Sequence, residues 1–413
     1  MAAANVVSTL NGLFKEVYAD DLEVVLPKGL KVQNDIKFAP RAQMPGNQFH
    51  QPVLLQHEHG FTYAAAGSGV FTLNASVAGK TEDATIVGTQ MMLRSQIGIE
   101  AAARAVKGPR AFKRVIDVVV ENMTASARKR MEIDYFYGQK GIGNCTGATI
   151  ATGANGTITF TKAEWAPGIW AGQEDAICEI FDSAMTTQRG GDHTITEINM
   201  SLRRVKFDSV NAGVTDGDVV FFKSQRTTSA HNVFAGLHAL LDSPTTLHGI
   251  TVANYSLWSP NSVAIGGALT FAGVNGAIPD AVGKGLDEDL SLYISPEVWA
   301  DLLDDEVAQR RWINSPKTGS YDVGAEGLQF YSQNGTTTIK PSIYCKNGLG
   351  FAIPTAHYRR IGATDLTYKL PDRGDEMFRH LESSAGYELR SYVNHSLFTR
   401  CPAYSILLTG ITT

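Results

Sequence analysis

The stretch that decides the fold is PRAFKRVIDVVVENMTASARKRMEIDYFYG, residues 109–138. Pro109 suits the first turn of a helix and Gly138 suits its C-terminal cap. Between them, apolar side chains recur every three or four residues. These are Ile116, Val120, Met123, Ala127 and Met131. The pattern predicts one long helix over 109–138 with a single apolar face. At about 1.5 Å per residue it would span roughly 45 Å, far more than an average globular helix.

Upstream of this helix, residues 51–94 are predicted to form an extended hairpin. The first half, QPVLLQHEHGFTYAAAGSGVFTLNASV, alternates apolar and polar side chains and is interrupted by Gly67 and Gly69. The return half, ATIVGTQMMLRSQIGI, is rich in β-branched and long apolar residues. A two-stranded ribbon of this length is marginally stable by itself in water. We therefore expect its large apolar side chains to contact a neighbouring subunit rather than the core of their own chain. These side chains are Phe61, Tyr63, Phe71 and Leu73.

The flanking segments are predicted to be less regular. Residues 1–46 are short apolar pieces broken by charges and prolines, which favours an extended arm, with a locally packed N-terminal lobe as the alternative. Residues 146–225 alternate apolar and polar side chains, and Asn155-Gly156 suits a tight turn. Residues from about 188 to 235 are expected to form a small inserted β subdomain.

The second half of the chain is predicted to mix helices and strands. Helices are expected over 278–288 and 296–311, and a buried strand over 290–295. Residues 326–361 and the C-terminal tail are expected to form strands, with Asn334-Gly335 at a hairpin turn. The order of these elements predicts an α+β fold.

Composition and net charge argue against several classes of function. The chain has 413 residues, of which 43% are hydrophobic and only 19% are charged. About 25% charged is typical, so part of the surface either lies against other subunits or is rich in Gly, Ser and Thr. The formal net charge of −5 argues against a nucleic-acid binder that is basic throughout. Residues 249–279 carry no Asp, Glu, Lys or Arg, but their Gly, Asn, Ser and Pro content argues against a membrane span. The N-terminus also lacks the features of a signal peptide.

Charge is unevenly distributed along the chain. Residues 101–140 hold nine Lys/Arg against four Asp/Glu, and residues 277–330 hold four against eleven. A subunit with one basic and one acidic region could face DNA with the first and solvent with the second. Two solvated helix faces are the alternative. The candidate genome-facing residues are Arg104, Lys107, Arg110, Lys113 and Arg114.

Catalytic and cofactor motifs are absent from the sequence. There is no phosphate-binding GxxxxGK[ST], no GxSxG and no HExxH. The glycines of Gly141–Gly147 approach a dinucleotide fingerprint, but the third is one place late and the segment follows a helix. The four cysteines are widely spaced, and His57-Glu58-His59 offers too few ligands for a zinc site. We therefore expect a protein that is not an enzyme and carries no cofactor or metal.

A series of segments in fixed order resembles one family. They are VYAD (17–20), HEHGFTY (57–63), DATIVGTQMMLR (83–94), AAARA (101–105), VENMTASARKRMEIDYFYGQKGIG (120–143), EWAPGIWAGQEDA (164–176), LYISPEVWADLL (292–303) and AGYELRSY (385–392). Together they resemble the major capsid proteins of tailed bacteriophages, whose Hong Kong ninety-seven-type fold herpesviruses share. No single segment is a sharp signature, and the resemblance rests on their order along nearly the whole chain.

The resemblance implies a division of the chain into parts. These are an N-terminal arm (1–46), an extended loop (47–98), a peripheral domain with a long spine helix (99–145), an axial domain (146–330) with an inserted β segment (about 188–235), and returning peripheral and axial strands (331–413). Because VYAD lies close to Met1, the scaffold is expected to be a separate protein rather than an N-terminal segment.

The resemblance also implies a function. Subunits would self-assemble as hexamers and pentamers into an icosahedral procapsid, which matures around the double-stranded DNA genome. The implied partners are other copies of the chain, a scaffolding protein, a portal protein, a decoration protein and the packaged DNA, with no membrane. The implied location is the virion capsid, assembled in the bacterial cytoplasm. A non-viral nanocompartment of the same fold and an enzyme with a dispersed site are the alternatives.

Overall fold

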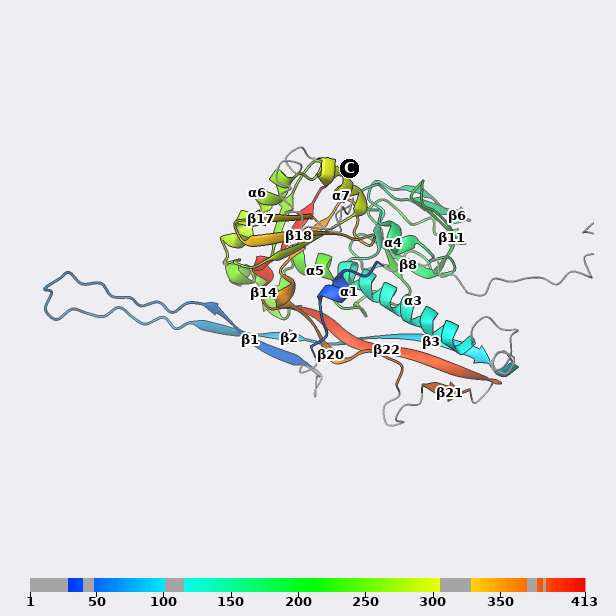
Figure 1. The fold of residues 1–413 in the computed structure, drawn as a ribbon, viewed down its shortest axis with the longest axis horizontal. Coiled ribbons are helices and arrows are strands. Elements are labelled where there is room, and N and C mark those ends of the chain that lie inside the picture. The colour runs from blue at the N-terminus through cyan, green and yellow to red at the C-terminus, as the bar shows by residue number, and fades with distance from the viewer. Residues whose placement is uncertain are drawn as a thin grey trace, which may run out of the picture.

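The computed structural model describes residues 29–39, 48–100, 115–304, 328–369, 377–381 and 384–412. Figure 1 shows a body of sheets and helices from which a long, thin hairpin projects to one side. The long helix α3 (Val115–Tyr137) lies over β3 (Thr89–Gly98) and β22 (Gly386–Thr399). The predicted α+β fold is confirmed.

Helix α3 follows the predicted apolar pattern. Met123, Ala127 and Met131 are all buried, and from Met131 to Gly138 every residue is enclosed. The predicted helix start at Pro109 lies outside the described residues. Gly138 directly follows the last helical residue, Tyr137, as predicted for the C-terminal cap, and Gln139 after it is left-handed, with φ of 70°. Gly138 is also needed for close packing, since a Cβ there would lie 2.3 Å from the carbonyl oxygen of Phe234.

The variant Gly138→Ala is expected to destabilise the fold by about 2–3 kcal/mol, the range for overpacked cores. The added carbon would also lie 2.7 Å from the backbone oxygen of Asp134, so backbone rather than a flexible side chain must move. Gly276→Ala in helix α6 (Phe271–Val282) is the matched control, because nothing lies within 4 Å of its added Cβ. That control should gain up to about 1 kcal/mol. Urea unfolding of both variants measures the difference, and equal stabilities would contradict this account of Gly138.

A four-stranded sheet lies beneath α3. It contains β20 (Tyr358–Thr367), β22, β21 (Phe378–His380) and β3. Strand β3 pairs antiparallel with β22 from Thr89 opposite His395 to Gly98 opposite Gly386. The predicted return half of the hairpin is therefore wrong beyond Ile86, because β3 leaves the hairpin for β22. Met91, Leu93 and Ile97 alternate with exposed residues, which suits a sheet with one face covered by a helix.

A six-stranded sheet is the second large sheet of the body. Its order is β15 (Asn261–Ala264), β23 (Ile406–Thr409), β19 (Gly350–Ile353), β16 (Leu290–Ile294), β18 (Gly335–Pro341) and β17 (Leu328–Ser332). Every residue of the central strand β16 is buried, as predicted for 290–295, and β17 and β18 are joined at the predicted Asn334-Gly335 turn.

Two helices accompany the six-stranded sheet, α6 and α7 (Pro296–Asp304). Helix α7 begins at Pro296 as predicted, and its predicted continuation to 311 lies outside the described residues. The helix predicted over 278–288 is displaced. It begins at Phe271 because Thr270 caps it, with its Oγ1 accepting from the N–H of Gly273 at 3.1 Å. Pro279 lies inside this helix rather than near its start.

A seven-stranded sheet is the third large sheet of the body. Its order is β4 (Gly143–Asn144), β12 (Val219–Phe222), β8 (Ile177–Phe181), β9 (His193–Asn199), β10 (Arg204–Phe207), β7 (Thr157–Thr159) and β5 (Thr149–Ala151). The segment predicted as an insertion, about 188–235, does not form a sheet of its own. Its strands β9, β10 and β12 pair with β8, β7 and β4 from earlier in the chain. The predicted turn at Asn155-Gly156 is confirmed by φ of 54° at Asn155.

Several short elements complete the fold. They are α1 (Val32–Asp35), β1 (Phe49–Gln56), β2 (Lys80–Ile86), β6 (Gly153–Ala154), α4 (Pro167–Trp170), β11 (Ser209–Val210), α5 (Leu237–Leu241), β13 (Thr246–Leu247) and β14 (Ile250–Thr251). Short 3₁₀ turns lie at Val252–Asn254, Ser256–Trp258, Thr355–His357 and Pro402–Tyr404.

Part of the predicted N-terminal arm is packed locally. Within residues 29–39, Val32 and Ile36 are buried against the body. The buried carboxylate of Glu132 on α3 accepts hydrogen bonds from the backbone N–H groups of Lys31, Val32 and Gln33 at 2.8, 2.8 and 2.9 Å. The expectation of an extended arm is therefore wrong for 29–39, since one carboxylate satisfies the first N–H groups of α1. The rest of the predicted arm lies outside the described residues.

Candidate assembly surface

The root of the projecting hairpin is formed by β1 and β2, which pair antiparallel from Phe49 opposite Ile86 to Gln56 opposite Lys80. Farther out, His59 and Val77 exchange two backbone hydrogen bonds of 2.8 Å. The chain reverses at residues 65–68, where the N–H of Ser68 donates to the oxygen of Ala65 and Gly67 adopts φ of +82°. The break predicted at Gly67 is thus the tip of the hairpin.

Only the root of the hairpin is held by the body. The Tyr255 hydroxyl donates to Glu82 at 2.7 Å, and the N–H of Thr85 donates to the oxygen of His248 at 2.8 Å. Phe49 packs edge-on against Phe398 with ring centroids 6.4 Å apart. From Gln56 to Thr81 nearly every residue is exposed, so the outer hairpin has no support from the rest of the described chain.

The outer hairpin carries large apolar side chains on its surface. Phe61, Tyr63, Phe71 and Leu73 are 71%, 90%, 49% and 73% exposed. Leu54, Val70 and Val77 are exposed as well, and sequence reasoning did not select them. Residues 60–79 contain no charged side chain and no histidine, a sequence signal that could have marked the whole segment. A contiguous, uncharged apolar projection of this kind is typical of a surface that another protein covers.

The residues predicted to face the genome, and the histidine pair weighed as a metal site, are not part of this apolar surface. Arg104, Lys107, Arg110, Lys113 and Arg114 all lie outside the described residues. His57, Glu58 and His59 are exposed on the hairpin. Among the residues with described positions, no three His, Cys, Asp or Glu side chains gather as a metal site would require.

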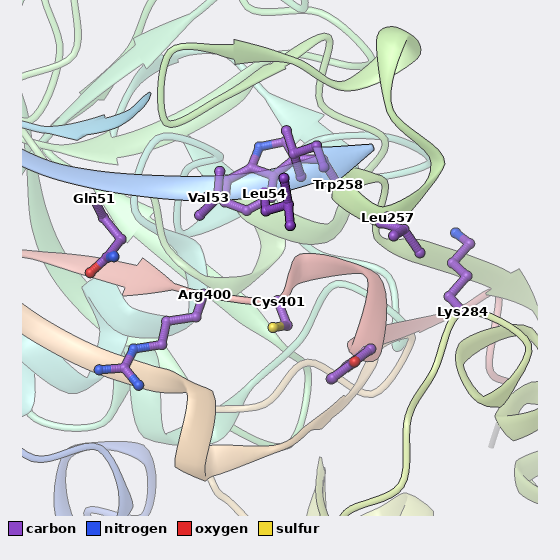
Figure 2. A pocket seen from close by; sticks show the side chains of 10 residues that line it. Gln51, Val53, Leu54, Leu257, Trp258, Lys284, Arg400 and Cys401 are labelled. Atoms are coloured by element: carbon purple, nitrogen blue, oxygen red, sulfur yellow. The ribbon is translucent and has the colours of Figure 1, made fainter. Parts of the chain in front are cut away.

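A pocket of about 500 Å³ lies beside the root of the hairpin (Figure 2). Its lining comes from β1, the 256–258 turn, Lys284 just after α6 and the corner between β22 and β23: Gln51, Val53, Leu54, Leu55, Leu257, Trp258, Lys284, Arg400, Cys401 and Tyr404. Two cations line it, Lys284 and Arg400, with no carboxylate or histidine. Burial raises the pKa of the Cys401 thiol, which disfavours the thiolate needed of a nucleophile. The pocket therefore offers no carboxylate or imidazole as a general acid or base.

Three histidines make the fold sensitive to acid. Burial lowers the pKa of His238, His248 and His395 to about 4, with Lys346 adding to the effect at His238 and Arg360 at His395. Each must stay neutral in the folded chain, so its stabilising contribution is complete above pH 6.5 and is lost as the pH falls toward 4. At about 1.4 kcal/mol per pKa unit, each contributes roughly 3 kcal/mol over that range.

We expect His248→Asn to flatten the fall in the free energy of unfolding between pH 6.5 and 4. Asparagine tolerates the left-handed backbone of His248, whose φ is 50°, and does not titrate. Burial raises the pKa of Asp134 to about 7, which acts in the opposite direction over this range, so the difference between wild type and variant is the informative quantity. Urea unfolding at pH 6.5 and 4.5 measures it. An unchanged slope would contradict the assignment.

Comparison with known proteins yields no sequence relative: no protein-family model and no curated protein matches the chain. Solved structures do match along its whole length. The cyanophage A-1(L) capsid superposes with a TM-score of 0.56 at 10% identity, over 99% of this chain and 100% of that one. The chain has the fold of a tailed-phage capsid protein. The capsid of a native GTA particle gives 0.53 at 9% identity, over 99% and 100% of the two chains. A Mycobacterium phage Adephagia structure gives 0.50 at 11%, over 100% and 99%.

Among the described residues of this capsid fold, the hairpin is the part that projects farthest from the body (Figure 1). The family expectation drawn from the ordered segments is confirmed at the level of the fold. None of the described helices is long and apolar enough to cross a membrane.

Proposed function

We propose that this chain is a major capsid protein that self-assembles as hexamers and pentamers into an icosahedral shell around the double-stranded DNA of a tailed phage. The observation that carries the proposal is the apolar hairpin. In a chain with a capsid fold, residues 60–79 form an uncharged projection held only at its root. Removing apolar surface of this extent from water lowers the free energy of the chain. A neighbouring copy that covers the hairpin would remove it from water.

In this proposal the hairpin within 47–98 is the extended loop, and Phe61, Tyr63, Phe71 and Leu73 lie against a neighbour. Helix α3 is the spine of the peripheral domain of 99–145. The six- and seven-stranded sheets supply most of the axial domain of 146–330, together with returning strands from 331–413. Contacts of this kind join different faces of identical subunits. They form a closed ring when the rotation from one subunit to the next adds up to a full turn.

The proposed partners follow from the same function. They are further copies of the chain, a scaffolding protein, a portal protein and a decoration protein. The packaged DNA is a further partner, met by the basic residues Arg104, Lys107, Arg110, Lys113 and Arg114. The chain would be made in the bacterial cytoplasm and reside in the virion capsid. No enzymatic step is part of the proposal.

Electron microscopy of the purified protein, with and without its scaffold, tests this function. We expect closed shells, tubes or ringed capsomers of one size class. Uniform particles of a single 44.6 kDa chain under every condition would overturn the proposal. Shells that enclose a protein cargo instead of DNA would point to a nanocompartment of the same fold.

A further inference from the structure

A second cavity, of about 740 Å³, lies where three parts of the chain meet. One wall is α3 between Asn122 and Asp134, another is the β3–β22 pair, and the third comes from the segments 172–173, 223–225 and 232–234. Its volume is in the range of ligand-binding cavities, which run from about 300 to 1,000 Å³. No part of the proposed assembly surface described above lies in it.

Two neighbouring cations of α3 line this cavity, and neither forms an ion pair within the described residues. Lys129 is only 8% exposed, and its ammonium donates to the backbone oxygen of Ala171. The guanidinium carbon of Arg130 lies 3.2 Å from the ring centre of Phe222. Burial lowers the pKa of Lys129 to about 8, the adjacent Arg130 charge adds to the effect, and Glu174 opposes it. Buried charge that is not fully balanced is costly, so this pair of cations is short of an anion.

The one carboxylate that lines the cavity balances at most one of the two cations. Asp134 is buried one helical turn beyond Arg130, and its Oδ1 accepts from Gln225 Nε2 at 2.6 Å. Burial raises its pKa to about 7, and the Arg130 charge opposes that effect. The third cation, Lys223, is already paired with Asp192.

His395, across the cavity on β22, adds an unused polar atom. Its Nε2 is hydrogen-bonded to the Tyr135 hydroxyl at 2.6 Å, while its Nδ1 is buried and has no partner in the described structure. Neutral amides of Asn122, Gln173 and Asn232 also line the walls. The cavity thus has more cationic and amide donors than its single carboxylate can satisfy.

We propose that this cavity receives a carboxylate side chain from a second copy of the chain, which pairs with Lys129 and Arg130. The inference rests on the proposed function, because only assembly brings a second copy close. Charge complementarity supports that occupant, since Lys129 and Arg130 line the cavity beside a single carboxylate. Glu58, Asp280 and Asp287 are among the exposed carboxylates that a second copy would present. An arginine with a flat aromatic support is well suited to bidentate carboxylate binding.

The first test is cross-linking with a water-soluble carbodiimide. The reagent activates a carboxylate, the Lys129 amine attacks it to form an amide, and the reagent leaves as its urea. Shells are assembled from a mixture of ¹⁵N-labelled and unlabelled subunits, cross-linked, digested and analysed by mass spectrometry. We expect a Lys129 peptide joined to an Asp or Glu peptide, with mixed isotopes, in shells and not in free subunits. Lys140, whose Nζ lies 2.6 Å from Asp242 of the same chain, is the internal control for cross-linking within one chain.

The second test compares two arginines two residues apart on α3. Arg130→Met should weaken subunit association in shells at least tenfold, because a charge-assisted hydrogen bond to a carboxylate is lost. Arg128→Met should leave association unchanged, because Arg128 is exposed and lies outside this cavity. Dissociation of shells in increasing urea, followed by light scattering, measures the difference.

Each other result has a definite meaning. Shells that form without a Lys129 cross-link, or with one confined to a single chain or to the scaffold, would overturn the inference and leave the proposed function intact. So would equal association of the two arginine variants. If wild-type subunits form no shells at all, the proposed function fails, and this inference fails with it.

Discussion

Serine at four apolar positions of the hairpin is expected to leave the subunit folded and to abolish shell assembly. The four positions are Phe61, Tyr63, Phe71 and Leu73, which are 49–90% exposed in the single chain. Exposed substitutions of this kind usually change the free energy of folding by no more than about 0.5 kcal/mol each. Burying such a side chain against a neighbour contributes about 1.5–3 kcal/mol, so losing four removes roughly 6–12 kcal/mol per contact. That corresponds to a loss of at least about 10⁴-fold in association.

Electron microscopy and sedimentation at matched concentrations measure this effect. A double variant, Met200→Ser with Leu202→Ser, is the control, because both side chains are exposed on the turn between β9 and β10, away from the hairpin. That control should assemble like the wild type. Normal shells from the fourfold variant would show that the apolar hairpin does not hold neighbours together.

Replacing Glu132 by alanine is expected to cost about 3–5 kcal/mol of folding free energy. Its carboxylate is buried and accepts three backbone hydrogen bonds, from Lys31, Val32 and Gln33. Removing it leaves buried donors unsatisfied and opens a void beneath α1. The three bonds also join segments about 100 residues apart, so their loss frees the 29–36 segment from the spine helix.

The conservative variant Glu132→Gln refines this prediction. One oxygen of the carboxylate accepts from Lys31 and Val32 and the other from Gln33, so glutamine can keep the first two bonds and lose the third. An intermediate loss of about 1–3 kcal/mol is therefore expected. Urea unfolding gives the free energies, and hydrogen exchange at Lys31–Gln33 locates the change. A stability of the alanine variant within about 1 kcal/mol of wild type would contradict the role assigned to Glu132.

Local signals predicted the parts of the fold that depend on neighbours in sequence. The apolar series Met123, Ala127 and Met131 identifies the buried face of α3, and the Asn155-Gly156 and Asn334-Gly335 pairs mark turns that the structure contains. These succeed because helix periodicity and turn chemistry are properties of a few adjacent residues.

Predictions failed where the deciding partner is remote in sequence. Residues 84–99 read as one strand of a hairpin, but the second half pairs with β22, about 300 positions away. The strands between 188 and 235 looked separable because their partners β4, β7 and β8 come earlier in the chain. The helix predicted over 278–288 begins earlier, at Phe271, because Thr270 caps it, a local signal that the sequence reasoning did not use.

One of the two candidate surfaces could be predicted from the sequence and the other could not. The exposed hairpin could be predicted because a long apolar ribbon has no covering element nearby in sequence. The cavity at Lys129 and Arg130 could not, because three separate segments must converge before two ordinary helix cations line one cavity without an ion pair among the described residues.

The most direct test of the central claim is a cryo-electron microscopy map of the assembled particle at side-chain resolution. The account predicts that residues 60–77 of each hairpin lie on a second copy of the chain, with Phe61, Tyr63, Phe71 and Leu73 buried in that contact. A map in which these side chains remain in solvent, or fold back onto their own subunit, would contradict it.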